Sequence, residues 1–60
     1  MVYTIISNIK HNEKRMAKLR RMNTRDAREQ AHRYVVGEAA TLKVKLTKKE
    51  IIHAAVAIVG

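Results

Sequence analysis

The 60-residue sequence contains no cysteine, no proline, no phenylalanine and no tryptophan, and it has only two glycines. Without cysteine, neither a disulfide nor a thiolate metal site can supplement so small a core. A chain of this length buries only about 60% of the surface that its unfolded form exposes. We therefore expect one domain over residues 1–60, enlarged by association into a homodimer.

Aromatic side chains are almost absent, since Tyr3 and Tyr34 are the only two. Proteins that read single-stranded nucleic acid stack its bases on aromatic rings. The sequence therefore disfavours single-stranded DNA or RNA as the main ligand.

Motifs for catalysis are also missing. The sequence has no glycine-rich phosphate loop and no His-x-x-x-His pair, and nothing in the spacing of His11, His32 and His53 suggests zinc ligands. A water-restricted catalytic pocket is hard to build in so short a chain. We expect no enzyme, no cofactor and no metal site.

No targeting or membrane segment is expected either. The N-terminal residues lack the basic and long apolar regions of a signal peptide, and the longest apolar run, 54–59, is far shorter than the ~20 residues that span a bilayer. These features predict a cytosolic protein.

Positive charge is what the sequence has in excess. Thirteen lysines and arginines face five acidic residues, which gives a formal net charge of +8. With 47% hydrophobic residues, the chain is too apolar for a disordered basic tail and should fold. A surface of this charge attracts polyanions and speeds encounter with them.

The pattern of residues predicts an α+β domain of order β-α(α)-β-α. Residues 2–6 are β-branched or aromatic and favour a strand. Asn12 can cap a helix that begins near residue 13. This helix either continues to about 36 or breaks near Asn23, which is itself a good N-cap, and Gly37 is placed where a left-handed C-terminal residue is expected.

The second half of the chain predicts a strand and a helix. Apolar residues alternate with lysines over 42–46, which is typical of a half-buried strand. Thr47 and Glu50 form a capping box before a helix over 48–58, whose apolar surface extends nearly all round and favours packing against a second copy. The expected core comprises Tyr3, Ile5, Met16, Leu19, Ala27, Ala31, Tyr34, Val35, Leu42, Val44, Leu46, Ile51, Ala55 and Ile58.

Basic residues concentrate between positions 10 and 33, where nine of them face three acidic residues, a net +6 of the total +8. On a continuous helix, five of these would form one stripe because their spacings are four, three, four and three. Two interpretations stay open for two further lysines on the second strand: they enter a major groove as part of a paired ribbon, or they protect an edge strand from aggregation. The candidate nucleic-acid-binding residues are Lys14, Arg15, Lys18, Arg20, Arg21, Arg25, Arg28, Lys43 and Lys45.

Two short patterns resemble known families. Residues 42–52 resemble the strand and capped helix that open ribbon-helix-helix regulators, which implies DNA reading by Lys43 and Lys45. The order β-α-α-β-α is similar to KH domains, although residues 20–24 lack the Gly-x-x-Gly that clamps the nucleic-acid backbone there. Neither resemblance identifies a family for this chain.

Two functions remain open. The first is a small regulatory or accessory protein that binds double-stranded DNA or structured RNA through phosphates. The second is an interaction module or inhibitor that docks its basic helix onto an acidic protein surface. The alternative to both functions is a solvated basic helix face that binds no partner, on which Glu29 pairs with Arg25 and Arg33.

Overall fold

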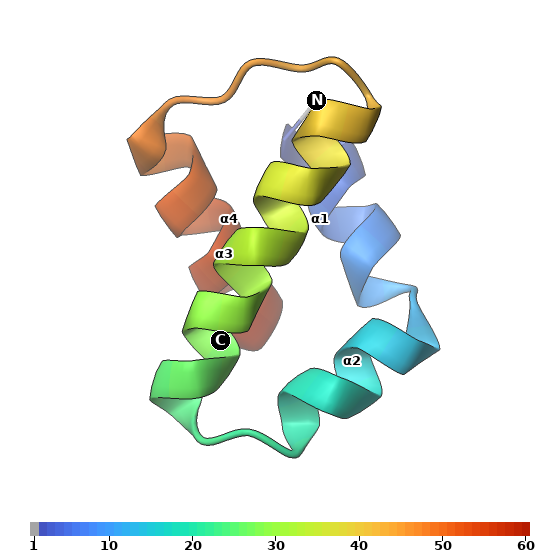
Figure 1. The fold of residues 1–60 in the computed structure, drawn as a ribbon, viewed down its shortest axis with the longest axis vertical. Helices are drawn as coiled ribbons and strands as arrows, with labels where there is room; N and C mark the ends of the chain where they lie inside the picture. Colours follow the sequence, from blue (N-terminus) through green and yellow to red (C-terminus); the bar gives the residue numbers. More distant parts are fainter. Residues whose placement is uncertain (1) are drawn as a thin grey trace.

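The computed structural model describes residues 2–60, and all the secondary structure in that range is α-helical (Figure 1). Four helices are present there, and no strand is. The prediction of an α+β domain with a two-stranded sheet was therefore wrong. The helices are α1 (Val2–Lys10), α2 (Glu13–Arg20), α3 (Thr24–Thr41) and α4 (Lys48–Val59).

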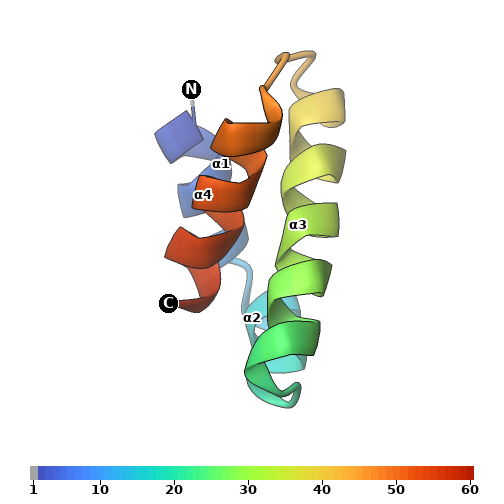
Figure 2. The same cartoon turned by 90° about the vertical axis from the view of Figure 1, so that its left-hand side faces the viewer.

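The longest helix, α3, contacts each of the other three helices. Helix α4 runs antiparallel to it and lies alongside it in both views (Figures 1 and 2). Helix α1 packs against both of them, and α2 lies beside the first turns of α3. A connector over residues 42–47 crosses from the end of α3 to the start of α4.

Small side chains allow α3 and α4 to pack closely. Helix α3 buries Ala27, Ala31 and Ala39 on one face, at spacings of four and eight, and α4 buries Ala54 and Ala55. Alanine at a helix contact allows the two helix axes to approach closely. The remaining buried residues are Ile5, Ile9, Leu19, Val35 and Ile58.

The first segment is a helix and not the predicted strand. Val2, Ile5, Ile6 and Ile9 follow the i, i+3, i+4, i+7 spacing of a helical face, and Ile5 and Ile9 are fully buried. No second strand exists in residues 2–60 to accept backbone hydrogen bonds, so a helix is what satisfies these groups internally. This outweighs the β-propensity of the individual residues, and Tyr3, predicted to be core, is 85% exposed.

The basic region forms two helices separated by a short turn, which is one of the two alternatives that the sequence left open. The side chains of Asn12 and Asn23 act as N-caps and accept hydrogen bonds from the backbone of Arg15 (3.1 Å) and Asp26 (2.9 Å). Arg21 is the C-cap of α2 and keeps helical angles, φ −83° and ψ −10°. The helical region therefore breaks where the side chain of Asn23 caps the start of α3.

Helix α3 does not end at Gly37, contrary to the prediction. It continues to Thr41 and closes in a Schellman motif, in which the amide of Lys43 donates to Ala40 (3.2 Å) and that of Val44 donates to Ala39 (2.8 Å). The left-handed position of the motif belongs to Lys43, at φ 56°. The sequence predicted that a glycine, Gly37, would take the left-handed position that ends this helix, and in the structure Lys43 takes it.

The predicted strand over 42–46 is an irregular connector. Its alternation does match burial, because Val44 and Leu46 are half-buried against the core while Lys43 and Lys45 are exposed. No neighbouring strand pairs with it in residues 2–60, so the alternation reflects a chain lying over the end of the core. Leu42, also predicted to be core, is 43% exposed.

The last helix and its cap confirm the prediction. The amide of Glu50 donates to the Thr47 hydroxyl (3.2 Å), and the Glu50 carboxylate accepts from the Thr47 amide (3.0 Å). Two hydrogen bonds with Thr47 lower the pKa of Glu50 below its ordinary value. The bond from the Thr47 backbone has the larger effect, and the bond with the Thr47 side chain has the smaller one.

Candidate functional site

Three exposed cations share one face of α2. Lys14 and Lys18 lie four residues apart, and Arg21 follows three residues later with helical backbone angles. The structure forms one ion pair within residues 2–60, and it involves none of these side chains. We call Lys14, Lys18 and Arg21 the α2 cations.

Arg15, also predicted to bind nucleic acid, makes contacts within the protein. Its guanidinium lies 3.0 Å from the carboxylate of Glu38 and 5.2 Å from the centre of the Tyr34 ring. Both partners belong to α3, so Arg15 joins α2 to α3 through an ion pair and a cation–π contact. The structure thus gives this arginine a role in packing the two helices.

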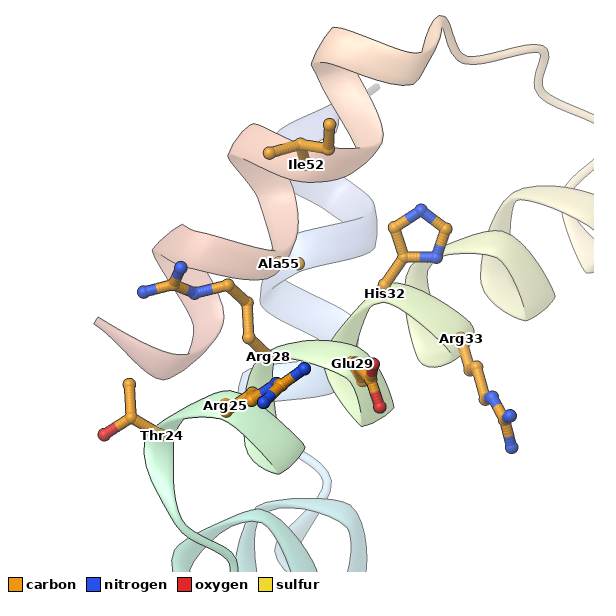
Figure 3. A pocket seen from close by; sticks show the side chains of 8 residues that line it. All are labelled: Thr24, Arg25, Arg28, Glu29, His32, Arg33, Ile52 and Ala55. Atoms are coloured by element: carbon orange, nitrogen blue, oxygen red, sulfur yellow. The ribbon is translucent and has the colours of Figure 1, made fainter.

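A groove of about 670 Å³ lies on the surface along the contact between α3 and α4 (Figure 3). Ile52 and Ala55 of α4 supply its apolar wall, and the other lining residues come from α3. In Figure 3 the side chain of Arg28 extends toward α4, whereas that of Arg33 points away from it. The full lining, which we call the α3–α4 groove, is Thr24, Arg25, Arg28, Glu29, His32, Arg33, Ile52 and Ala55.

A smaller groove of about 300 Å³ lies between α2 and the ends of α3 and α4. Arg20 stands on its edge among mostly apolar neighbours such as Leu19 and Ile58. Thr24 borders both grooves, so the two meet at the start of α3. Arg20 therefore lies on a different side of α2 from the α2 cations, which line neither groove.

The predicted stripe of five cations is thus divided. It required one continuous helix, and the turn at Arg21 to Asn23 separates Lys14 and Lys18 from Arg25 and Arg28. The first pair is on α2 with Arg21 following, and the second pair lines the α3–α4 groove. The pairing of Glu29 with Arg25 or Arg33 is not formed in the described residues.

Lys43 and Lys45 lie in the connector, at the opposite end of the molecule from the turn between α2 and α3 (Figure 1). Because no strand forms there, the paired ribbon that was to carry them into a major groove does not exist in residues 2–60. The strand that the resemblance to ribbon-helix-helix regulators implied is therefore absent from residues 2–60, and the KH-like order β-α-α-β-α is wrong for the same reason.

Within residues 2–60, the other reactive groups do not assemble into a site. The hydroxyl of Ser7 lies 3.1 Å from Nδ1 of His11, but both residues are exposed and line neither groove. Over residues 2–60 no three potential metal ligands come together. In the same range, no helix has both the length and the apolar character needed to cross a membrane.

Comparison with known protein families, characterised proteins and solved structures gives no match for this chain. The candidate site is therefore described from the residues of this chain alone. Sequence reasoning missed His32, Arg33 and Ile52 as groove residues, since their proximity depends on the antiparallel packing of α3 and α4. The unusually apolar surface of the last helix was the one signal that pointed to Ile52.

Proposed function

We propose that the protein binds nucleic acid through the phosphate backbone, in a regulatory or accessory role without catalysis, and that the α2 cations make the principal contacts. The observation that carries this proposal is their arrangement. Lys14, Lys18 and Arg21 are exposed on one helical face, and no carboxylate within residues 2–60 pairs with them. Cations that are free and aligned are what phosphate contacts require.

The spacing of the α2 cations suits a duplex backbone. From Lys14 to Arg21 the helix rises about 10 Å, at ~1.5 Å per residue. Phosphates on one strand of DNA follow one another every ~3.4 Å along the axis. Over that length one strand presents about four successive phosphates, so a helix lying along the backbone can place its three cations against three of them.

The ligand is proposed to be double-stranded DNA or structured RNA. Stacking of unpaired bases needs accessible rings, and Tyr34 is half-buried beneath Arg15. Tyr3 is exposed but stands on α1 without a second ring near it in sequence. Phosphate contacts need no such rings, so a paired backbone fits this surface better than single strands.

The experiment is a fluorescence-anisotropy titration of a labelled DNA duplex and an RNA hairpin at low and moderate salt. Three phosphate contacts predict that affinity for the duplex falls about 40-fold between roughly 50 and 200 mM salt, because counterions are released on binding. No binding at the lower salt, or binding that salt does not weaken, would refute the proposal.

A further inference from the structure

We infer that the α3–α4 groove is a docking site for an acidic amphipathic helix of another protein. This surface contains none of the α2 cations, so the inference goes beyond nucleic-acid binding and is tested separately. Two features carry it, an uncovered apolar wall and a surplus of positive charge along the edge.

The apolar wall continues beyond the groove along α4. Ile52 is 51% exposed and Val56, four residues later on the same helical face, is 42% exposed. Adjoining apolar side chains left open to water beside a groove gain free energy when a partner covers them. The occupant must therefore bring apolar side chains of its own.

The charge of the groove selects among possible occupants. Arg25 and Arg28 line it against a single carboxylate, that of Glu29, and Arg33 adds a positive charge at its end with a side chain directed away from α4. A second copy of this chain would bring arginines toward arginines and a net charge of +8 toward +8. A nucleic-acid backbone would satisfy the arginines but has no apolar side chains for the wall formed by Ile52. An acidic amphipathic helix satisfies both.

The shape of the groove suits a helix. It lies between two antiparallel helices, and a third helix packs into such a groove as in helical bundles and helix-in-groove complexes. Along α3 it extends from Thr24 to Arg33, about 14 Å at ~1.5 Å per residue. That length corresponds to about two and a half turns of a docked helix, at ~5.4 Å per turn.

The probe for the test is a labelled, helix-stabilised peptide of about twelve residues, with leucines at helical spacing on one face and glutamates elsewhere. Its binding to the full chain is measured by anisotropy. Arg28→Glu reverses an edge charge, and Ile52→Asp places a carboxylate on the apolar wall. Lys45→Glu makes the same charge change as Arg28→Glu in the exposed connector, outside the groove.

The expected result is that Arg28→Glu and Ile52→Asp each weaken peptide binding about tenfold or more, as the loss of a central interface contact does. Lys45→Glu should weaken it about twofold or less, in line with a distant exposed charge. A peptide of the same composition with its leucines scattered should bind at least about tenfold more weakly.

Several results would overturn the inference. These are no binding of the peptide, equal losses for Arg28→Glu and Lys45→Glu, or equal affinity for the scattered peptide. Sedimentation equilibrium supplies another, since a dimer that Ile52→Asp abolishes would show that a second copy covers the groove. If circular dichroism showed that Ile52→Asp unfolds, the comparison between Arg28→Glu and Lys45→Glu would still decide.

Discussion

Replacing Gly37 with alanine should stabilise the protein. Gly37 lies inside α3, on its exposed side, and its backbone carbonyl accepts a hydrogen bond from the Thr41 hydroxyl at 3.0 Å. A methyl group added at this position meets no atom within 4 Å, and the backbone angle φ is not positive. The alanine side chain therefore causes no clash and no backbone strain.

The magnitude follows from the conformational freedom that glycine loses in a helix. Inside a helix, glycine is less favourable than alanine by about 1 kcal/mol. In a domain of about 60 residues, a gain of ~1 kcal/mol in the free energy of unfolding raises Tm by about 4–8 °C. The opposite sign is expected if Gly37 ended the helix in a left-handed conformation, where alanine costs about 1–2 kcal/mol.

The assay is thermal unfolding followed by circular dichroism at 222 nm, with Gly37→Ala and native protein compared in the same buffer. Ala40→Gly, at an exposed position of the same helix, is the matched control and should lower Tm. A lower Tm for Gly37→Ala would refute the continuity of α3 through this residue and restore the helix end that the sequence suggested.

Three further predictions test the structure elsewhere. Lys43→Gly should raise the free energy of unfolding by about 0.5–1 kcal/mol in urea titrations, because Lys43 occupies the left-handed position of the Schellman motif; no change would contradict that conformation. Ile9→Val should lower it by about 0.5–1.5 kcal/mol since Ile9 is fully buried, whereas Ile52→Val on the surface should change it by less than about 0.5 kcal/mol; similar losses would argue against this core. The carboxylate of Glu50, whose pKa is lowered by folding, stabilises the protein above its unfolded pKa, and this contribution disappears as pH falls through the folded pKa. The difference in Tm between native protein and Glu50→Gln should therefore shrink between neutral pH and about pH 3, and a difference independent of pH would exclude the charged capping box.

Local signals in the sequence predicted the helix ends that side chains build. The sequence predicts Asn12 and Thr47 as N-caps because each side chain can accept a hydrogen bond from the first helical turn and each precedes a run of helix-forming residues. Lys43 escaped recognition because lysine rarely takes a left-handed angle, and only the whole fold places it there.

The strands could not be judged from local propensity alone. Residues 2–6 and 42–46 have strand-like composition or alternation, but a strand exists only where a partner is available for its hydrogen bonds. Extending the first window to Ile9 would have revealed the helical spacing of Ile5 and Ile9. The same limit applies to the candidate site. The sequence shows where the cations occur along the chain, but their division between α2 and the α3–α4 groove depends on the fold.

The measurement that tests the proposed function most directly is the salt dependence of duplex binding for single alanine variants. Lys14→Ala, Lys18→Ala and Arg21→Ala should each weaken binding and reduce the log–log salt slope by about 1, because each removes one phosphate contact. Lys45→Ala, which removes an equal charge from the connector, should leave the slope unchanged. Equal changes for all four variants, or slopes that none of them alters, would contradict binding through the α2 cations.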